Sequence, residues 1–323
     1  MRQIAGSTIL VTGGAGFIGS HLIDRLIAEG ASHIVVVDNL FVGDEANVAE
    51  AQATGKITFY REDIELASGL AYIFERHNIH SVFNCATKAL NYSFVNPSNA
   101  FSTNVTGVLN LLELQRRGAF TSLCHFSTSE VFGSAVYEPM DEAHPRNATT
   151  TYAAGKAAAD LAVESYVRMF GLDSFIVRPF NNYGPRQNYR GALAGVIPLT
   201  AWRIHTGQQP EIHGTGQQSR DFIYVDDTVD AVVKLFRVLG AGENVNISTD
   251  NQIKIEDLVA RICAEMGYQG SVRRGDARPA DVLCHNASNA KVRALINYQL
   301  TPFEKGLSHT LEWYRARWEG PTQ

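Results

Sequence analysis

The stretch Ile9-Leu10-Val11-Thr12-Gly13-Gly14-Ala15-Gly16-Phe17-Ile18-Gly19 decides the fold of this chain. It is an apolar, strand-like run that ends in spaced glycines, and an amphipathic segment, residues 17–29, begins directly behind it. Gly13 permits a tight turn, Gly16 lets backbone N–H groups approach a pyrophosphate, and Gly19 lets the helix pack close to the strand. Because a helix N-terminus is the positive end of a dipole, this pattern predicts a dinucleotide-binding turn rather than a simple loop.

A carboxylate after the second predicted strand indicates which dinucleotide binds. Val35-Val36-Val37 ends at Asp38, whose carboxylate can accept hydrogen bonds from both ribose hydroxyls of adenosine and would repel a 2′-phosphate. We therefore expect NAD rather than NADP. After the third strand, Asp63 and Ile64 either meet the adenine edge or belong to a solvated acidic loop. The residues expected to contact NAD are Gly13, Gly16, Phe17, Ile18, Gly19, Asp38, Asn39, Asp63 and Ile64.

Strand-like and helix-like segments alternate through the first half of the chain. This alternation predicts an α/β fold of the Rossmann type, a doubly wound parallel sheet with helices on both faces. The predicted strands are residues 8–12, 33–38, 57–60, 80–85, 120–127 and 173–179, and the predicted helices are residues 17–29, 66–77, 97–117 and 151–171.

The alternation loosens after Pro179, which predicts two unequal domains. Residues 1–178 would form an NAD-binding Rossmann domain. Residues 179–323 would form mainly a smaller substrate domain, with part of roughly 222–250 returning to the first domain. The helices predicted in this second half are residues 191–206, 226–239, 255–266 and 303–317.

The composition argues against several classes of function. The 323 residues are 45% hydrophobic and carry a net charge of -5, without the basic stripe that nucleic-acid binding needs. No apolar run approaches the roughly 18 residues of a membrane span, and the N-terminus lacks a signal-peptide pattern. The four cysteines are far apart. We therefore expect reduced thiols, no metal site, and a cytoplasmic protein without nucleic-acid or membrane partners.

A tyrosine and a lysine four residues apart provide the main catalytic signal. Tyr152 and Lys156 share one face of a predicted helix, and an ammonium near a phenol lowers the pKa of the phenol from about 10. Such a tyrosine can act as a base. Ser127-Thr128-Ser129-Glu130 places hydroxyls and a carboxylate at the carboxyl edge of the sheet, where open α/β folds bind ligands. Alone, the spacing more often marks a solvated helix face; beside a dinucleotide turn it favours catalysis.

Further motifs follow the glycine turn in a fixed order. They are Ser127-Thr128-Ser129-Glu130-Val131-Phe132-Gly133, Tyr152-Ala-Ala-Gly-Lys156, Arg178-Pro-Phe-Asn-Asn-Tyr-Gly-Pro185 and Arg220-Asp-Phe-Ile-Tyr-Val-Asp-Asp227. With this set the chain resembles the extended short-chain dehydrogenases/reductases over nearly its whole length. Within them it is similar to the NAD-dependent nucleotide-sugar epimerases, dehydratases and decarboxylases. The resemblance implies an enzyme with NAD as cofactor and a nucleotide-diphosphate sugar as substrate.

The resemblance also implies roles for single residues. Tyr152 would take the proton of the sugar C4 hydroxyl while hydride passes to NAD, Lys156 would hold the nicotinamide ribose and tune Tyr152, and Thr128 would hydrogen-bond the same hydroxyl. Charged and amide side chains suit diphosphate oxygens. For Lys88 and Arg278 an exposed loop position is the alternative. The residues expected to contact the substrate are Lys88, Ser129, Asn181, Arg220 and Arg278.

Glu130 bears on which reaction follows a 4-keto sugar. A 4-ketone acidifies the C5 hydrogen, so a nearby carboxylate can remove it and expel the C6 hydroxyl, which is 4,6-dehydration. Simple 4-epimerases need no such base. If Glu130 faces solvent or caps the turn before Phe132, epimerisation is the better interpretation. We expect dehydration with Glu130 as a catalytic residue, and 4-epimerisation as the alternative.

Other assignments are weaker. The dTDP-glucose dehydratases carry Thr-Asp-Glu, whereas this chain has Ser129, a poor acid, in the middle position. Decarboxylases carry a late arginine where this chain reads Cys284-His285-Asn286, so UDP-glucuronate decarboxylation comes third. A non-catalytic NAD-binding protein is a remote alternative, because Thr128, Tyr152 and Lys156 are all present.

The resemblance finally implies an assembly. Family members usually pair through two helices of each subunit. The apolar faces of residues 97–117 and 151–171 could form such a four-helix bundle, so we expect a homodimer.

Overall fold

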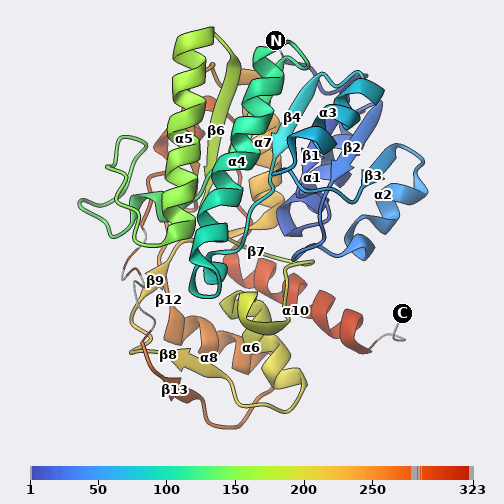
Figure 1. Cartoon of the computed structure of the whole chain (residues 1–323). Coiled ribbons are helices and arrows are strands. Elements are labelled where there is room, and N and C mark those ends of the chain that lie inside the picture. Colours follow the sequence, from blue (N-terminus) through green and yellow to red (C-terminus); the bar gives the residue numbers. More distant parts are fainter. Residues whose placement is uncertain (1, 278–281, 283, 285, 320–323) are drawn as a thin grey trace.

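A seven-stranded parallel sheet lies at the centre of the computed structural model, which describes residues 2–277, 282, 284 and 286–319. Its strands are β1 Thr8–Thr12, β2 His33–Val37, β3 Ile57–Tyr60, β4 Ser81–Asn84, β5 Ser122–Phe126, β6 Asp173–Pro179 and β11 Asn244–Ile247. They are ordered β11-β6-β5-β4-β1-β2-β3, with Leu10 of β1 opposite Val35 of β2 and Val82 of β4 (Figure 1). The predicted Rossmann-type α/β fold is confirmed.

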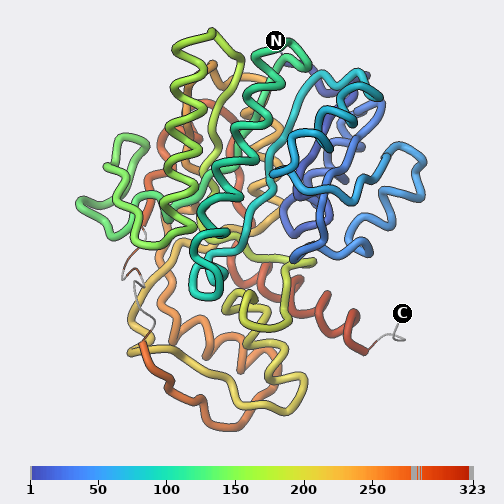
Figure 2. The backbone as a smooth tube through the Cα atoms, in the orientation of Figure 1, coloured from blue at the N-terminus to red at the C-terminus, as the bar shows by residue number. Residues whose placement is uncertain are grey.

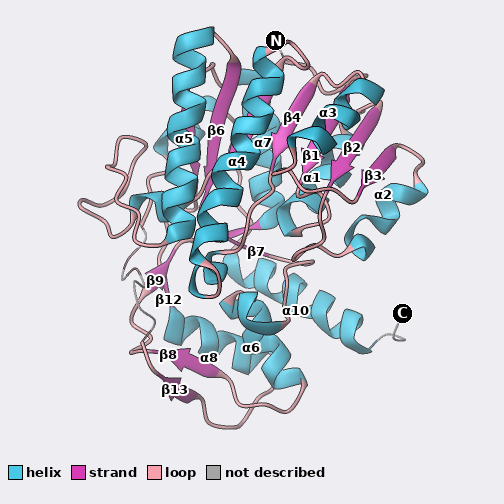
Figure 3. Ribbon diagram, in the orientation of Figure 1, coloured by secondary structure: helices cyan, strands magenta, loops and turns pink. Residues whose placement is uncertain are grey.

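Helices cover both faces of this sheet (Figure 3). They are α1 Phe17–Ala28 and α7 Val225–Val238 on one face, and α3 Ala67–Arg76, α4 Pro97–Arg116 and α5 Thr151–Phe170 on the other. Side chains of β1 alternate between the layers, because Ile9 and Val11 pack with α1 and α7 whereas Leu10 packs with α3, α4 and α5. Across the described residues, no helix has the length and apolarity of a bilayer-spanning segment.

A smaller group of elements lies below the sheet in the view of Figure 1. It contains α6 Val196–His205, α8 Ile255–Glu265, α10 Phe303–Glu319 and three strand pairs, β7 Asn181–Tyr183 with β10 Phe222–Tyr224, β8 Glu211–His213 with β13 Arg273–Gly275, and β9 Ser219–Arg220 with β12 Ile253–Lys254. Two short helices, α2 Ala49–Ala53 and α9 Ala290–Leu295, complete the α-helices of the described residues. The smaller group has its own apolar core, which includes Tyr183, Leu258 and Leu311.

The chain passes between the sheet and the smaller group more than once (Figure 2). It leaves the sheet after β6, returns with α7 and β11, and leaves again for α8. β11 pairs with β6, with Asn244 opposite Ile176. The division of the chain into domains of residues 1–178 and 179–323 stays a prediction.

Several segments differ from the elements expected from the sequence, which did not include the short helices α2 and α9 or the short strands of the smaller group. The helix predicted over residues 191–206 is interrupted, because a 3-10 turn, Gly191–Leu193, is followed by extended backbone at Gly195 before α6 begins. Pro198 lies in the first turn of α6, where its missing N–H leaves no helical hydrogen bond unmade. β11 was not predicted, because its four residues become a strand only by pairing with β6.

Candidate functional site

A cavity of about 560 Å³ lies at the carboxyl ends of the central strands, a size typical of small-molecule sites. Its wall combines the glycine turn, the segments after β2, β4 and β5, the start of α5, and residues of the smaller group. Every site residue expected from the sequence lines this cavity, with one exception. Arg278, like His285 of the decarboxylase comparison, lies outside the described residues.

The glycine turn is shaped by close contacts between backbone segments. Gly13 has a φ of +66°, and a Cβ there would lie 2.8 Å from the backbone of Ala86. A Cβ at Gly19 would overlap the carbonyl oxygen of Gly13. Side chains are therefore excluded at both positions, and the N-terminus of α1 meets the end of β1 at the cavity wall.

Asp38 is held against this turn. Its carboxylate accepts hydrogen bonds from the backbone N–H groups of Ala15 at 3.0 Å and Leu40 at 2.8 Å. Burial raises the pKa of Asp38, and these N–H groups together with the charge of Lys88 act in the opposite direction. The Lys88 ammonium lies 3.8 Å from the ring centroid of Phe41. Lys88 is thus buried on the Asp38 side of the cavity rather than on an exposed loop.

Asp63 has defined partners in the same region. It accepts a hydrogen bond from the side-chain amide of Asn39 at 2.7 Å and from the backbone N–H of Glu65 at 2.9 Å. Ile64 beside it is buried. These contacts hold the segment after β3 against the segment after β2, as part of the cavity wall.

The start of α5 fixes the position of Tyr152. The Thr150 hydroxyl caps the helix by accepting a hydrogen bond from the backbone N–H of Ala153 at 3.2 Å. The Ser93 hydroxyl accepts from the backbone N–H of Tyr152 at 2.9 Å. Two of the otherwise unpaired N–H groups of the first helical turn are satisfied in this way.

The ionisation of Tyr152 differs from the expectation. The pKa of Tyr152 is raised to about 12, mainly by burial and also by the charges of Glu130 and Asp160, while hydrogen bonding with Thr128 and Thr87 acts in the opposite direction. The lowering that was expected from Lys156 is absent. The reason is geometric, because the Lys156 ammonium donates its hydrogen bond to the carbonyl oxygen of Phe126, at 2.8 Å.

Lys156 is itself strongly perturbed. Its side chain is almost fully buried, and burial lowers the pKa of Lys156 to about 8, although the charge of Asp160 opposes this shift. The ammonium and the phenol of Tyr152 both line the cavity. Proton transfer and positive charge are therefore available at one wall of the site.

Another part of the cavity wall comes from the smaller group. The backbone N–H and side-chain amide of Asn181 both donate to the carbonyl oxygen of Asp221. The Arg220 guanidinium donates to the carbonyl oxygens of Ser219 and Val282, at 2.9 and 2.6 Å. These contacts set the orientation of an amide and a guanidinium at the cavity wall, where both can meet anionic oxygens.

The structure adds residues that the sequence analysis missed. Thr87 lines the cavity, donates to the side-chain oxygen of Asn104 at 2.7 Å and hydrogen-bonds Tyr152. It lies in a loop after β4, where no periodic pattern marks it. Asp160 lies one helical turn after Lys156, so its spacing was a usable signal. Within the described residues, no group of three or more His, Cys, Asp or Glu side chains is arranged to hold a metal ion.

Comparison with known proteins identifies the family. The family model described as GDP-mannose 4,6 dehydratase matches residues 10–310. The chain therefore belongs to this family, among the NAD-dependent nucleotide-sugar epimerases and dehydratases of the extended short-chain dehydrogenases/reductases. The resemblance inferred from the sequence motifs is confirmed.

Relatives with both reactions are similar over almost the whole chain. The UDP-glucose 4-epimerase of Mycolicibacterium smegmatis is 30% identical over 95% of this chain and 98% of its own length. The dTDP-glucose 4,6-dehydratase 1 of Escherichia coli is 31% identical over 95% of this chain and 92% of its own. These relatives are enzymes, and they do not separate dehydration from epimerisation.

Solved structures of a dehydratase and of an epimerase are also similar to this chain. The dTDP-glucose 4,6-dehydratase of Streptomyces venezuelae, solved with NAD and TYD, has a TM-score of 0.91 at 30% identity, over 96% of this chain and 98% of that one. The UDP-glucose 4-epimerase of Thermotoga maritima, solved with UDP-glucose, has a TM-score of 0.90 at 31% identity, over 96% and 99%.

The buried ammonium of Lys156 predicts a cost to stability. Because its pKa in the folded chain lies below that of an unfolded lysine, the protonated amine destabilises the fold at neutral pH, and this cost fades as pH rises from about 8 toward 10.5. We expect Lys156→Met to raise the free energy of unfolding at pH 7, by on the order of 1–3 kcal/mol, and to lose most of this gain at pH 10. Urea denaturation at both pH values measures this change in the free energy of unfolding. The exposed Lys305→Met is the control, and an equal gain at both pH values would contradict the assignment.

Proposed function

We propose that this protein dehydrates a nucleotide-diphosphate sugar through a 4-keto intermediate, with NAD as cofactor. The observation that carries the proposal is the position of Glu130. Its carboxylate lines the cavity with Tyr152 and acts electrostatically on the phenol of that residue. The Tyr152 phenol and the Glu130 carboxylate thus provide two acid/base groups at one wall. This matches a reaction that needs proton transfer at two neighbouring carbons.

The residues around the glycine turn fit a dinucleotide. The close backbone approach at Gly13 and Gly19 leaves the N-terminus of α1 open to a pyrophosphate, and Asp38 and Asp63 offer carboxylates to ribose and adenine. Bound NAD would supply the hydride acceptor for the sugar C4 and the positive charge of its nicotinamide ring. The remaining expected contacts are Gly16, Phe17, Ile18, Asn39, Ile64 and Lys156.

The chain's own residues would handle the first proton. Tyr152 takes the proton of the C4 hydroxyl, while Thr128 hydrogen-bonds the same hydroxyl. The phenol, whose pKa is raised to about 12 in the structure, needs positive charge nearby before it ionises at neutral pH. The nicotinamide ring of bound NAD would contribute such charge, and the buried Lys156 ammonium would hold a ribose hydroxyl. Asn181 and Arg220, and Lys88 and Ser129 at other parts of the wall, would bind the substrate.

Glu130 would act as the base in the second stage of the reaction, the elimination of water. Once C4 is a ketone, the Glu130 carboxylate removes the acidified C5 proton and delivers it to the C6 hydroxyl, which leaves as water. Bound NAD would supply the hydride for C6. A solvent proton would reach C5 through Glu130 and would replace the C4 hydroxyl proton that Tyr152 takes and releases to solvent, so the net change is the loss of one water.

Epimerisation at C4 is the second candidate, and Ser129 favours it. The Ser129 side chain is buried at the cavity wall and supplies a hydroxyl, which is a poor acid for protonating a departing C6 hydroxyl. In that case the 4-keto sugar turns over and receives hydride on its other face. The similarity to UDP-glucose 4-epimerases supports this second candidate.

We also propose a homodimer built on α4 and α5, which pack side by side (Figure 1). Phe101 of α4 and Leu161 and Met169 of α5 are exposed, Leu161 by 53% and Met169 by 70%. Large apolar side chains grouped on two adjacent helices are typical of a buried helix–helix interface.

The four free thiols fit a reducing compartment such as the cytoplasm.

Tyr152→Phe tests the acid/base role. Removing the hydroxyl leaves the ring packing but no proton acceptor, so turnover of a nucleotide sugar should fall by about 10² to 10⁴. Steady-state kinetics, with circular dichroism to check the fold, measure this effect. Tyr166→Phe is the matched control on the same helix, because the Tyr166 hydroxyl bonds Glu113 away from the cavity. Equal turnover in wild type and Tyr152→Phe would overturn the proposed function.

Glu130→Gln separates dehydration from epimerisation. Mass spectrometry on UDP-, GDP-, CDP- and dTDP-sugars in heavy water should show loss of water and uptake of solvent deuterium at C5 in the wild type. Glu130→Gln should lose both, because the amide cannot accept the C5 proton. The control is Glu138→Gln, whose carboxylate bonds Gln252 outside the cavity wall. An unchanged mass with an altered retention time would instead identify an epimerase.

Leu161→Glu combined with Met169→Glu tests the dimer. Charges placed at the centre of an apolar interface should convert the dimer to a monomer, as measured by light scattering coupled to gel filtration. Val238→Glu is the control, since Val238 is also 52% exposed but ends α7 on the other face of the sheet. A wild-type chain that elutes as a monomer would contradict the proposal.

A further inference from the structure

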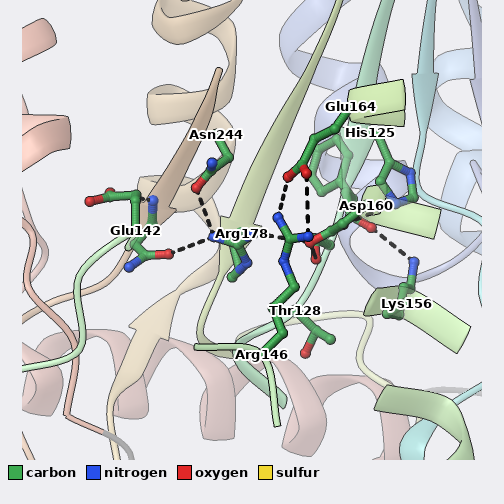
Figure 4. A network of polar contacts seen from close by, with 12 residues as sticks. His125, Thr128, Glu142, Arg146, Lys156, Asp160, Glu164, Arg178 and Asn244 are labelled. Carbon is green, nitrogen blue, oxygen red and sulfur yellow. Dashed lines mark hydrogen bonds and ion pairs between the residues drawn. The ribbon is translucent and has the colours of Figure 1, made fainter. Parts of the chain in front are cut away.

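A fully buried ion pair, Asp160 with Arg178, lies near Thr128 and Lys156 (Figure 4). Asp160 of α5 and Arg178 of β6 both have no exposed surface, and their closest atoms, Oδ2 and Nη2, are 2.9 Å apart. Desolvating two charges costs about as much as their attraction returns, so stability alone explains such a pair poorly. Its position suggests a second purpose.

Asp160 connects the two elements that carry the proposed catalytic residues. Its Oδ2 accepts a hydrogen bond from the Ser127 hydroxyl at 2.8 Å, and Ser127 directly precedes Thr128 at the end of β5. On its own helix, Asp160 lies one turn after Lys156, and its charge favours the protonated form of that lysine. One carboxylate therefore holds the residue before Thr128 and acts electrostatically on Lys156.

The remaining contacts hold this carboxylate in place. Arg178 donates to the side-chain oxygens of Asn244 and Asn246 on β11, at 3.1 and 3.2 Å. The Nε2 atom of the buried His125 lies 3.7 Å from Oδ1 of Asp160. Asp160 is thus held from α5, β5, β6 and β11 together, as Figure 4 shows for the side chains around it.

We propose that Asp160 is a positioning residue, which holds the end of β5 that bears Thr128 and the turn of α5 that bears Lys156 in the arrangement that proton transfer requires. The inference rests on the proposed function, because it assigns Asp160 to the reaction of that site. It differs from a purely structural role in one respect. Removal of the Asp160 charge changes the pH dependence of turnover, and not only the stability of the fold.

The direction of that change follows from the groups around the Lys156 ammonium. Asp160 and the Cys85 thiol favour its protonated form. The other titratable or charged groups of this buried cluster are His125, Arg178 and Tyr152. Burial, with the charges of Lys156 and Arg178, lowers the pKa of His125 far below its usual range, so His125 is neutral. The charge of Asp160 raises the pKa of Tyr152, so its removal favours the ionised phenol and does not move the basic limb upward. Without the Asp160 charge, the pKa of Lys156 falls further, and turnover is lost at a lower pH on the basic side.

The other end of β5 offers a matched control. There Asp173 accepts from Ser122 at 2.5 Å and pairs with Arg2, which repeats the Ser–Asp–Arg arrangement away from the cavity. We compare Asp160→Asn with Asp173→Asn in kcat, KM and pH–rate profiles. Asp160→Asn should lower kcat at least about tenfold and move the basic limb down by about one pH unit. Asp173→Asn should lower the midpoint of unfolding and leave the basic limb of the pH–rate profile at its wild-type position.

Ser127→Ala keeps the inference testable if Asp160→Asn does not fold. It removes one hydroxyl and leaves the ion pair intact, so it should lower kcat several-fold with little change in KM, whereas Ser122→Ala should not. If both serine variants, or both aspartate variants, have the same kinetics, Asp160 has no positioning role. The proposed function is judged separately by Tyr152→Phe. If Tyr152→Phe is inactive while the two serine variants have the same kinetics as each other, and the two aspartate variants likewise, only the inference about Asp160 fails.

Discussion

Helix α1 can begin where β1 ends only because no side chain lies between them. A Cβ at Gly13 would meet the backbone of Ala86, one at Gly14 would lie 2.7 Å from the Val36 side chain, and one at Gly19 would overlap Gly13. This approach places the positive end of a helix dipole at the carboxyl edge of the sheet. The cavity, the carboxylate of Asp38 and the proposed catalytic residues are all arranged around that edge.

Burial dominates the electrostatics of the site. It raises the pKa of Tyr152 and lowers that of Lys156, so burial shifts both groups toward their neutral forms, although Lys156 stays mainly protonated at pH 7. Each charge supplied nearby therefore acts strongly, since the surroundings screen it little. The buried Asp160 and Arg178 belong to this balance, and the hydroxyls of Thr87 and Thr128 add hydrogen bonds to it.

The two walls of the cavity come from different parts of the fold. The sheet side carries Thr128, Tyr152 and Lys156, to which the proposed function assigns the oxidation of a sugar hydroxyl. The smaller group carries Asn181 and Arg220, which the proposal assigns to substrate binding. A dehydratase and an epimerase are about equally similar to this chain, so the shared fold does not decide between the two reactions. In our proposal, that choice depends on single residues such as Glu130 and Ser129.

The sequence by itself determined what depends on neighbours along the chain. The glycine turn, the Asp38 carboxylate, the Tyr152 and Lys156 spacing and the alternation of the first half were all readable, because each is a local pattern of geometry or period. Only the tertiary structure decided the pKa of Tyr152, the contact of Lys88 with Phe41, the pairing that makes β11 a strand, and the place of Asp160 near the site. These depend on burial and on contacts between residues far apart in the chain, which no local pattern encodes.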